Sequence, residues 1–195
     1  MNGKFDLTRV GFPIKCMGPL SILEQVPVAA CSSPIYLNYA ASLSDPVERV
    51  RLVMVNSISY YYLGNIFEKP LNPVLGETYQ AIAGDGSGVF AEQTSHHPPT
   101  SHFYVHGPNG AYYFHGWQSY SVTPYPNSAV LTVEGGKEVR FHDGQRVKFN
   151  NSGDLITNTV MGTMGHQITG KVTFTDEANE IVGWYELGNC GRKKH

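Results

Sequence analysis

The feature that most constrains the fold is a long succession of short β-rich runs, which begins after Gly76. The runs combine branched and aromatic residues with polar ones, and hairpin-type turn signals such as Asn109-Gly110 and Asp143-Gly144 separate them. A chain that repeats strand and turn in this way is typical of an antiparallel sandwich or barrel. The sequence therefore predicts a mainly β fold for most of the chain.

One helix is expected before the β-rich region, over residues 46 to 62. Asp45 is suited to cap this helix, Pro46 fits its first turn, and Glu48 follows the cap by three residues. Apolar residues then recur at helical spacing: Val47, Val50, Met54, Ile58 and Tyr61. Residues 1 to 45 contain several spaced prolines, so that only a short helical turn within PLSILEQ, with Pro19 at its first position, is predicted there.

Composition and charge exclude several classes of protein. A chain of 195 residues with 41% hydrophobic residues has the size of one domain and enough apolar side chains for a core. The net charge of -2 argues against a dedicated nucleic-acid binder, and the basic cluster of residues 192 to 194 is interpreted as a solvated tail. No apolar run suits a signal peptide or a membrane span, which predicts peripheral membrane contact at most. The scattered Cys16, Cys31 and Cys190 favour reduced thiols in a cytosolic protein.

The segment EQTSHHPP places His96 and His97 directly before two prolines. Neighbouring side chains of a strand point to opposite faces, so we expect this pair at the end of a strand, with its direction fixed by the prolines. Three interpretations remain open: a structural turn, a metal site, and an anion site in which two imidazoles and a lysine hold a phosphate. A metal site would need further ligands, for which the available histidines are His102, His106, His115 and His166. No metal-binding spacing is present, which makes this interpretation the least favoured of the three.

A second segment, EKPLNPVLGETY, precedes the first predicted strand. Pro70 and Pro73 stiffen this loop, and Gly76 permits a tight turn into the strand. The loop would hold the ammonium group of Lys69 in a defined position, which makes Lys69 a candidate binding residue.

These segments carry a resemblance to a known family. EQTSHHPP resembles the EQVSHHPP signature of the oxysterol-binding protein family, and KPLNPVLGE resembles its KPxNPxLGE segment. GPLSILEQ is similar to the family's lid segment, with Gly18 where the family usually has glutamate. SISYYYLGN is similar to the helical stretch that ends in a tyrosine before the KP motif. The resemblance covers nearly the whole chain.

The resemblance implies a lipid-transfer domain and not an enzyme. The implied fold is an incomplete antiparallel β-barrel around a hydrophobic tunnel, with an N-terminal lid and one helix. Residues 1 to 195 would form a single lipid-binding domain, in which 1–45 are the lid and lead-in, 46–62 the helix and 63–195 the partial barrel. The implied ligands are sterol or a related lipid, or phosphatidylserine in some branches of the family, and phosphatidylinositol 4-phosphate in exchange. The implied location is cytoplasmic, in transient contact with organelle membranes, without a cofactor, metal or nucleic acid.

The resemblance also implies a set of site residues. Those expected at the phosphoinositide headgroup are Lys69, Asn72, His96 and His97. Those expected in the tunnel and at its entrance are Tyr60, Leu71 and Leu75. The lid residues expected to cover the ligand are Leu20, Ile22 and Leu23.

Two alternatives to lipid transfer stay open at this point. One is a lipid sensor without net transport, and the other is a small metal-dependent β-barrel enzyme that uses the histidines. The chain is also short of a full family domain at its C-terminal end, which leads us to expect exposed sheet edges or apolar surface.

Overall fold

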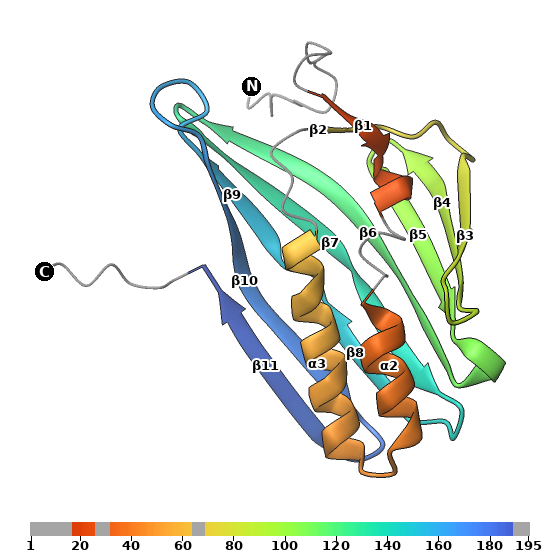
Figure 1. Ribbon diagram of the computed structural model, residues 1–195. Coiled ribbons are helices and arrows are strands. Elements are labelled where there is room, and N and C mark those ends of the chain that lie inside the picture. Colours follow the sequence, from red (N-terminus) through yellow and green to blue (C-terminus); the bar gives the residue numbers. More distant parts are fainter. Residues whose placement is uncertain (1–16, 26–31, 64–68, 189–195) are drawn as a thin grey trace, which may run out of the picture.

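The computed structural model describes residues 17–25, 32–63 and 69–188 (Figure 1). In this part of the chain two helices lie against one face of a long, curved sheet, and a small two-stranded sheet lies near one end of it. The helices are α2 (Ser33–Ser42) and α3 (Pro46–Leu63). Neither is long and apolar enough to cross a membrane.

The described strands form a two-stranded and a nine-stranded sheet. The small sheet pairs β1 (Met17–Ser21) with β2 (Lys69–Leu71) in parallel. The large sheet contains β3 (Thr78–Ile82), β4 (Gly88–His96), β5 (Pro99–His106), β6 (Tyr112–Tyr125), β7 (Ser128–Phe141), β8 (Arg146–Asn150), β9 (Gly153–Thr157), β10 (Gly165–Asp176) and β11 (Ile181–Leu187). Its main order is β11-β10-β8-β7-β6-β5-β4-β3, while β9 pairs with β7 and β10.

The strand pairs of the large sheet are antiparallel, which confirms the predicted mainly β class. Within the described residues, β3 and β11 are its two edges and do not pair with each other, so the barrel is incomplete. The face covered by the helices is called the inner face below, and the opposite face the outer face.

Helix α3 corresponds to the helix predicted over residues 46 to 62. The Asp45 carboxylate accepts a hydrogen bond from the Val47 backbone N–H at 2.8 Å, which caps the first turn. The predicted apolar stripe is only partly correct, since Val47 is 41% and Ile58 45% exposed, whereas Val53 is fully buried. The reason is that α3 contacts both α2 and the strands β10 and β11, so that its buried surface is wider than one stripe.

The interpretation of residues 1 to 45 as free of a longer helix was wrong. Pro34 lies in the first turn of α2, where proline lacks only a backbone donor that would be unpaired there. Pro19, expected to start a helical turn, lies in β1, and the turn begins after Ser21. There the Ser21 N–H donates to the Glu24 carboxylate at 2.6 Å and the Glu24 N–H donates to the Ser21 hydroxyl at 3.3 Å, which is a capping box.

The core lies between the two helices and the inner face of the sheet. Tyr60 of α3 stacks on Phe114 of β6, with ring centroids 6.0 Å apart, and the row of rings continues through Phe149 to Phe174. Fully or almost fully buried apolar residues surround this row: Leu37, Ala40, Val53, Val105, Tyr112, Val139, Phe141, Val147 and Val172. Aromatic rings at these spacings contribute stability beyond the burial of their area.

A buried arginine ties the helices to the sheet. Arg49 is 3% exposed, and its guanidinium donates hydrogen bonds to the Ala40 carbonyl at 3.1 Å and the Asp143 carboxylate at 2.5 Å. It also donates to the Gln145 side-chain carbonyl at 3.0 Å. Because the buried charge is paired and hydrogen-bonded, it fixes the lower ends of α2 and α3 on the turn between β7 and β8.

Candidate functional site

The turn that contains KPLNPVLGE and the strand that contains EQTSHH are hydrogen-bonded to each other. The Gly76 N–H donates to the Gln93 carbonyl at 2.8 Å, and the Gln93 N–H donates to the Glu77 carbonyl at 3.0 Å. Gly76 has φ of 77°, a left-handed conformation that glycine adopts without strain. The two sequence motifs therefore meet through backbone hydrogen bonds at the start of the β3–β4 pair.

His96 is the last residue of β4, and Pro99 begins β5. The histidine pair thus lies where a strand ends, as the prolines predict. Both imidazoles are exposed, and their ring centroids are 4.7 Å apart in an edge-on arrangement. Within the described ranges neither imidazole has a hydrogen-bond partner, and the binding role of the pair stays a prediction.

Gln93 organises this hairpin from below, a role that the sequence did not reveal. Its side chain is 1% exposed; its amide N–H₂ donates to the Ser95 carbonyl at 2.9 Å, and its carbonyl accepts from the Ser101 hydroxyl at 2.5 Å. The β4–β5 register shifts between Gln93 and Ser95. A buried amide with both ends satisfied holds this irregularity in one conformation, which fixes the direction of the two histidines. Gln93 follows Val89 and Ala91 at alternate positions of the strand, and this spacing could have identified it as buried.

The predicted residues of the KPLNP segment lie around the same turn. Lys69 is the first residue of β2, and its side chain lies outside the described part of the structure. Asn72 is exposed directly after β2, while Pro73 is buried and anchors the turn. Leu71 is 36% and Leu75 67% exposed, so two apolar side chains lie at the surface next to the polar ones.

The segment predicted to be a lid is paired with this region. In the register of β1 and β2, Met17 lies opposite Lys69 and Ser21 opposite Leu71. Leu20 is 39% exposed, Ile22 is half-buried and Leu23 is completely buried. Leu23 is therefore fixed in the protein interior, and the covering role of the three residues stays a prediction.

Tyr60, predicted at the bottom of a tunnel, is half-buried and packs against the core. Its hydroxyl is 3.1 Å from the Ser33 hydroxyl and accepts a hydrogen bond from the Asn56 amide at 3.4 Å. Burial raises the pKa of this phenol well above its ordinary value, so it stays neutral. The ammonium of Lys137 lies 5.7 Å from the centre of its ring. Sequence reasoning did not single out Lys137.

The four histidines considered as further metal ligands do not gather at the histidine pair. His102 Nδ1 is 2.8 Å from the Thr94 hydroxyl, His115 is 3.8 Å from Glu138, and His166 is 2.8 Å from Asp154. His106 packs edge-on against the ring of Tyr113. In the part of the chain that the structure describes, no three histidine, cysteine or acidic residues are arranged to hold a metal ion.

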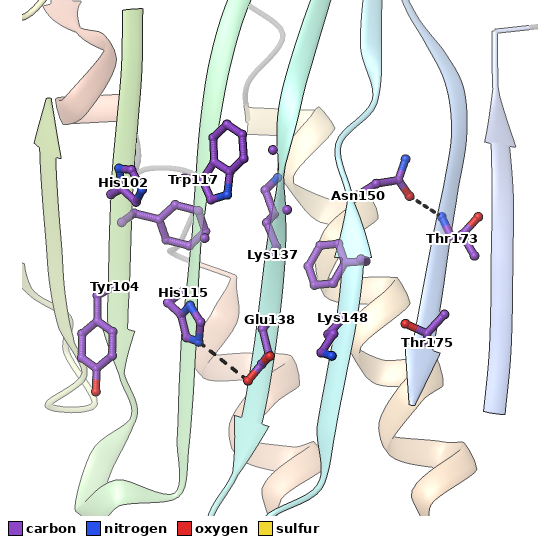
Figure 2. Close-up of a pocket in the computed structure, with 15 residues that line it drawn as sticks. His102, Tyr104, His115, Trp117, Lys137, Glu138, Lys148, Asn150, Thr173 and Thr175 are labelled. Carbon is purple, nitrogen blue, oxygen red and sulfur yellow. Dashed lines mark hydrogen bonds and ion pairs between the residues drawn. The ribbon is translucent and has the colours of Figure 1, made fainter. Parts of the chain in front are cut away.

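A groove of about 760 Å³ lies elsewhere, where strands β5 to β8 and β10 meet (Figure 2). The labelled side chains His115 and Glu138 face each other across it, with His102, Trp117 and Tyr104 to one side. The helices lie behind the sheet in this view, so the groove opens on the outer face. Apart from His102 and His115, none of the residues predicted from sequence lines it.

The model of the oxysterol-binding protein family matches residues 1–191. The chain belongs to this family. It is 34% identical to oxysterol-binding protein 9 of Dictyostelium discoideum over 182 residues, which are 93% of this chain and 42% of that protein. It is 37% identical to human oxysterol-binding protein-related protein 1 over 115 residues, which cover 57% of this chain and 12% of the relative. The chain thus spans less than half the length of these relatives.

Solved structures of the family share the fold. The Osh1 ORD domain in complex with ergosterol superposes with a TM-score of 0.80 at 24% identity, over 88% of this chain and 42% of that one. The Osh3 ORD of Saccharomyces cerevisiae in complex with PI(4)P gives a TM-score of 0.77 at 22% identity, over 90% and 47%. At these identities the likeness establishes that this chain has the fold of an oxysterol-binding protein.

Proposed function

We propose that this chain is a lipid-transfer domain, which carries a sterol or a related lipid between membranes and exchanges it for phosphatidylinositol 4-phosphate. The observation that carries the proposal is the hydrogen-bonded contact between the KPLNPVLGE turn and strand β4, which ends at His96. Residues 1 to 195 would act as one lipid-binding domain. The complexes of related ORD domains with ergosterol and with PI(4)P support the two ligand classes.

The phosphorylated headgroup is proposed to bind at the two turns. His96 and His97 are exposed, close together and held in direction by the hairpin, and a phosphate can accept hydrogen bonds from both rings. Imidazole titrates near neutral pH, so an anion favours its protonated form. Lys69 and Asn72 would contact the inositol phosphates from the neighbouring turn, where Lys69 adds a fixed positive charge.

The apolar part of the lipid needs cover, because each CH₂ group left in water costs about 0.8 kcal/mol. Leu71 and Leu75, exposed beside the headgroup turn, are proposed to line the entrance. Tyr60 would close the far end, and the segment with Leu20, Ile22 and Leu23 would cover the ligand. Such a protein binds and moves lipid without chemical conversion, at the cytoplasmic face of organelle membranes and in transient contact with them.

The test is transfer between two populations of vesicles, one with a fluorescent sterol and one with phosphatidylinositol 4-phosphate. We expect the protein to accelerate sterol movement, and to do so more when the acceptor contains the phosphoinositide, because the two ligands leave in opposite directions. Binding of both lipids without faster movement would replace transfer by sensing. Binding of neither lipid would disprove the proposal.

A further inference from the structure

Lys137 is a charged residue at a core-facing position of β7. Successive side chains of a strand alternate between faces, so Lys137 shares the inner face with Val139 and Phe141, which are 0% and 1% exposed. Gly116 lies opposite it on β6, and a Cβ at Gly116 would be 2.9 Å from the Lys137 side chain and 3.0 Å from the ring of Phe103. The glycine thus leaves the space that the lysine side chain occupies.

Lys137 is half-buried, lines the groove of Figure 2 and has its ammonium near two aromatic rings, and no described carboxylate pairs with it. It lies 5.7 Å from the ring centre of Tyr60 and 5.9 Å from that of Phe149. No hydrogen bond or ion pair to Lys137 is present among the described residues, and the adjacent Glu138 faces His115 on the outer face. Burial lowers the pKa of this lysine to about 8. Two aromatic faces compensate only part of the cost of burying a cation, so the site favours an anion.

The inner face of β6 and β7 continues beyond Lys137 with apolar side chains. Strands β6 and β7 run well past the ends of α2 and α3 (Figure 1). In that stretch the first inner pair is Gln118 opposite Gly135, and two half-buried apolar pairs follow, Tyr120 opposite Val133 and Val122 opposite Leu131. Leu131 lies six positions before Lys137 on β7, which is about 20 Å along the strand. A mainly apolar stretch of this length thus ends at a cation that has no partner among the described residues.

We propose that Lys137 binds the carboxylate of an acidic lipid whose apolar body lies along the inner face of β6 and β7. The inference rests on the proposed lipid-binding function and adds a ligand class to it, a long apolar body with one carboxylate. The charge of Lys137 selects this occupant, since a carboxylate completes the ion pair that the protein leaves open. A neutral lipid of the same shape leaves the ammonium unpaired.

The experiment compares ligand pairs that differ only in charge. Binding of oleic acid and oleyl alcohol, and of cholesteryl hemisuccinate and cholesterol, is measured on the wild-type protein, on Lys137→Met and on Lys171→Met. Lys171 is the matched control, because its ammonium also lies over an aromatic ring, 4.4 Å from that of Trp184, but on an exposed part of the sheet. We expect the wild-type protein and Lys171→Met to bind the acid at least about tenfold more tightly within one pair, and Lys137→Met to lose that preference.

The pair that shows the preference identifies the source of the carboxylate, a fatty acid or an acidic sterol. Equal affinity of the wild-type protein within both pairs would overturn the inference, and this comparison needs no variant. A preference that survives in Lys137→Met would also overturn it. If sterol and phosphoinositide bind but neither acid is preferred, only this inference fails. If no lipid binds, the proposed function fails with it.

Discussion

The helix-covered core and the two adjacent turns differ in how their side chains are used. In the core, Phe114 and Arg49 are almost completely buried, and each contacts several elements of the fold. At the turns, His96, His97 and Asn72 are exposed, and the local structure is held by backbone hydrogen bonds and by Gln93. We therefore expect stability to depend on the core and propose ligand binding at the turns. A substitution in the core should change mainly stability, and one at the turns mainly ligand affinity.

The largest effect is expected in the core. Phe114→Ala removes a ring that packs against Tyr60, Phe103 and Phe149 at centroid distances of 6.0, 5.0 and 6.1 Å. The cavity should lower the free energy of unfolding by about 3 to 5 kcal/mol, measured by urea denaturation. Phe90→Ala, at a 44% exposed position, is the control and should cost less than about 1 kcal/mol. Equal losses would contradict a core concentrated under the helices.

The second effect belongs to the turns and should leave stability intact. Replacing His96 and His97 together with alanine removes charge-assisted hydrogen bonds worth about 1.5 to 3 kcal/mol each, which seldom add completely. Affinity for vesicles with phosphatidylinositol 4-phosphate should fall at least about tenfold, while sterol binding and the urea midpoint stay unchanged. His142→Ala, at another exposed histidine, should have no effect on either lipid. Wild-type phosphoinositide binding by the double variant would show that the histidine pair is only a structural turn.

Lys137 combines features of both regions, because it faces the core from a half-buried position and carries a charge. Burial lowers the pKa of Lys137 in the native state from its ordinary value of 10.5 to about 8. At pH 7 both states hold the proton, and the native state carries the full cost of the buried charge. Between these pH values the unfolded state binds more protons, so this group makes stability rise with pH.

Lys137→Met should therefore stabilise the ligand-free protein by about 2 kcal/mol at pH 7 and by less than about 1 kcal/mol at pH 10. The measurement is urea denaturation at both pH values, with Lys171→Met as the reference for general effects of charge removal. A variant that is less stable than the wild type at pH 7 would give Lys137 a structural role instead of a binding one.

The smallest effect is expected at Tyr60. Tyr60→Phe keeps the ring on Phe114 but removes the hydroxyl contacts with Ser33 and Asn56, which should cost about 1 kcal/mol of stability. Sterol affinity should fall more than phosphoinositide affinity if Tyr60 closes the tunnel. Tyr62→Phe, at an 88% exposed position of the same helix, is the matched control. Equal loss of both lipids would indicate only a change in folding.

The β-rich pattern, the position of α3 and the strand end at His96 could be predicted from local sequence signals. Helix α2 could not, because Ile35 and Tyr39 on its surface are 68% and 58% exposed, which hides the periodicity of the buried Leu37 and Ala40. Its proline was also interpreted as a break, although proline is tolerated in a first turn.

The exposed residues of the candidate site could be predicted from the sequence, whereas the buried residues that support them could not. The motifs name the residues that face solvent, whereas the buried amide of Gln93 and the ammonium of Lys137 depend on which face each strand turns inward. Gly135 and Gly136, directly before Lys137, interrupt the alternation of apolar and polar residues that would show which face points inward. Arg49 contacts Asp143 and Gln145, which follow it by 94 and 96 positions in the sequence. No local sequence pattern indicates such contacts.

The parallel pairing of β1 with β2 couples the ordering of two segments that lie far apart in the sequence. Met17 to Ser21 and Lys69 to Leu71 share one ladder, so any contact that orders one strand lowers the entropy lost when the other is ordered. Release of the N-terminal strand has to break the ladder that positions the backbone of Lys69. A molecule bound at that backbone therefore disfavours detachment of the strand at equilibrium, and detachment of the strand weakens binding of the molecule by the same factor.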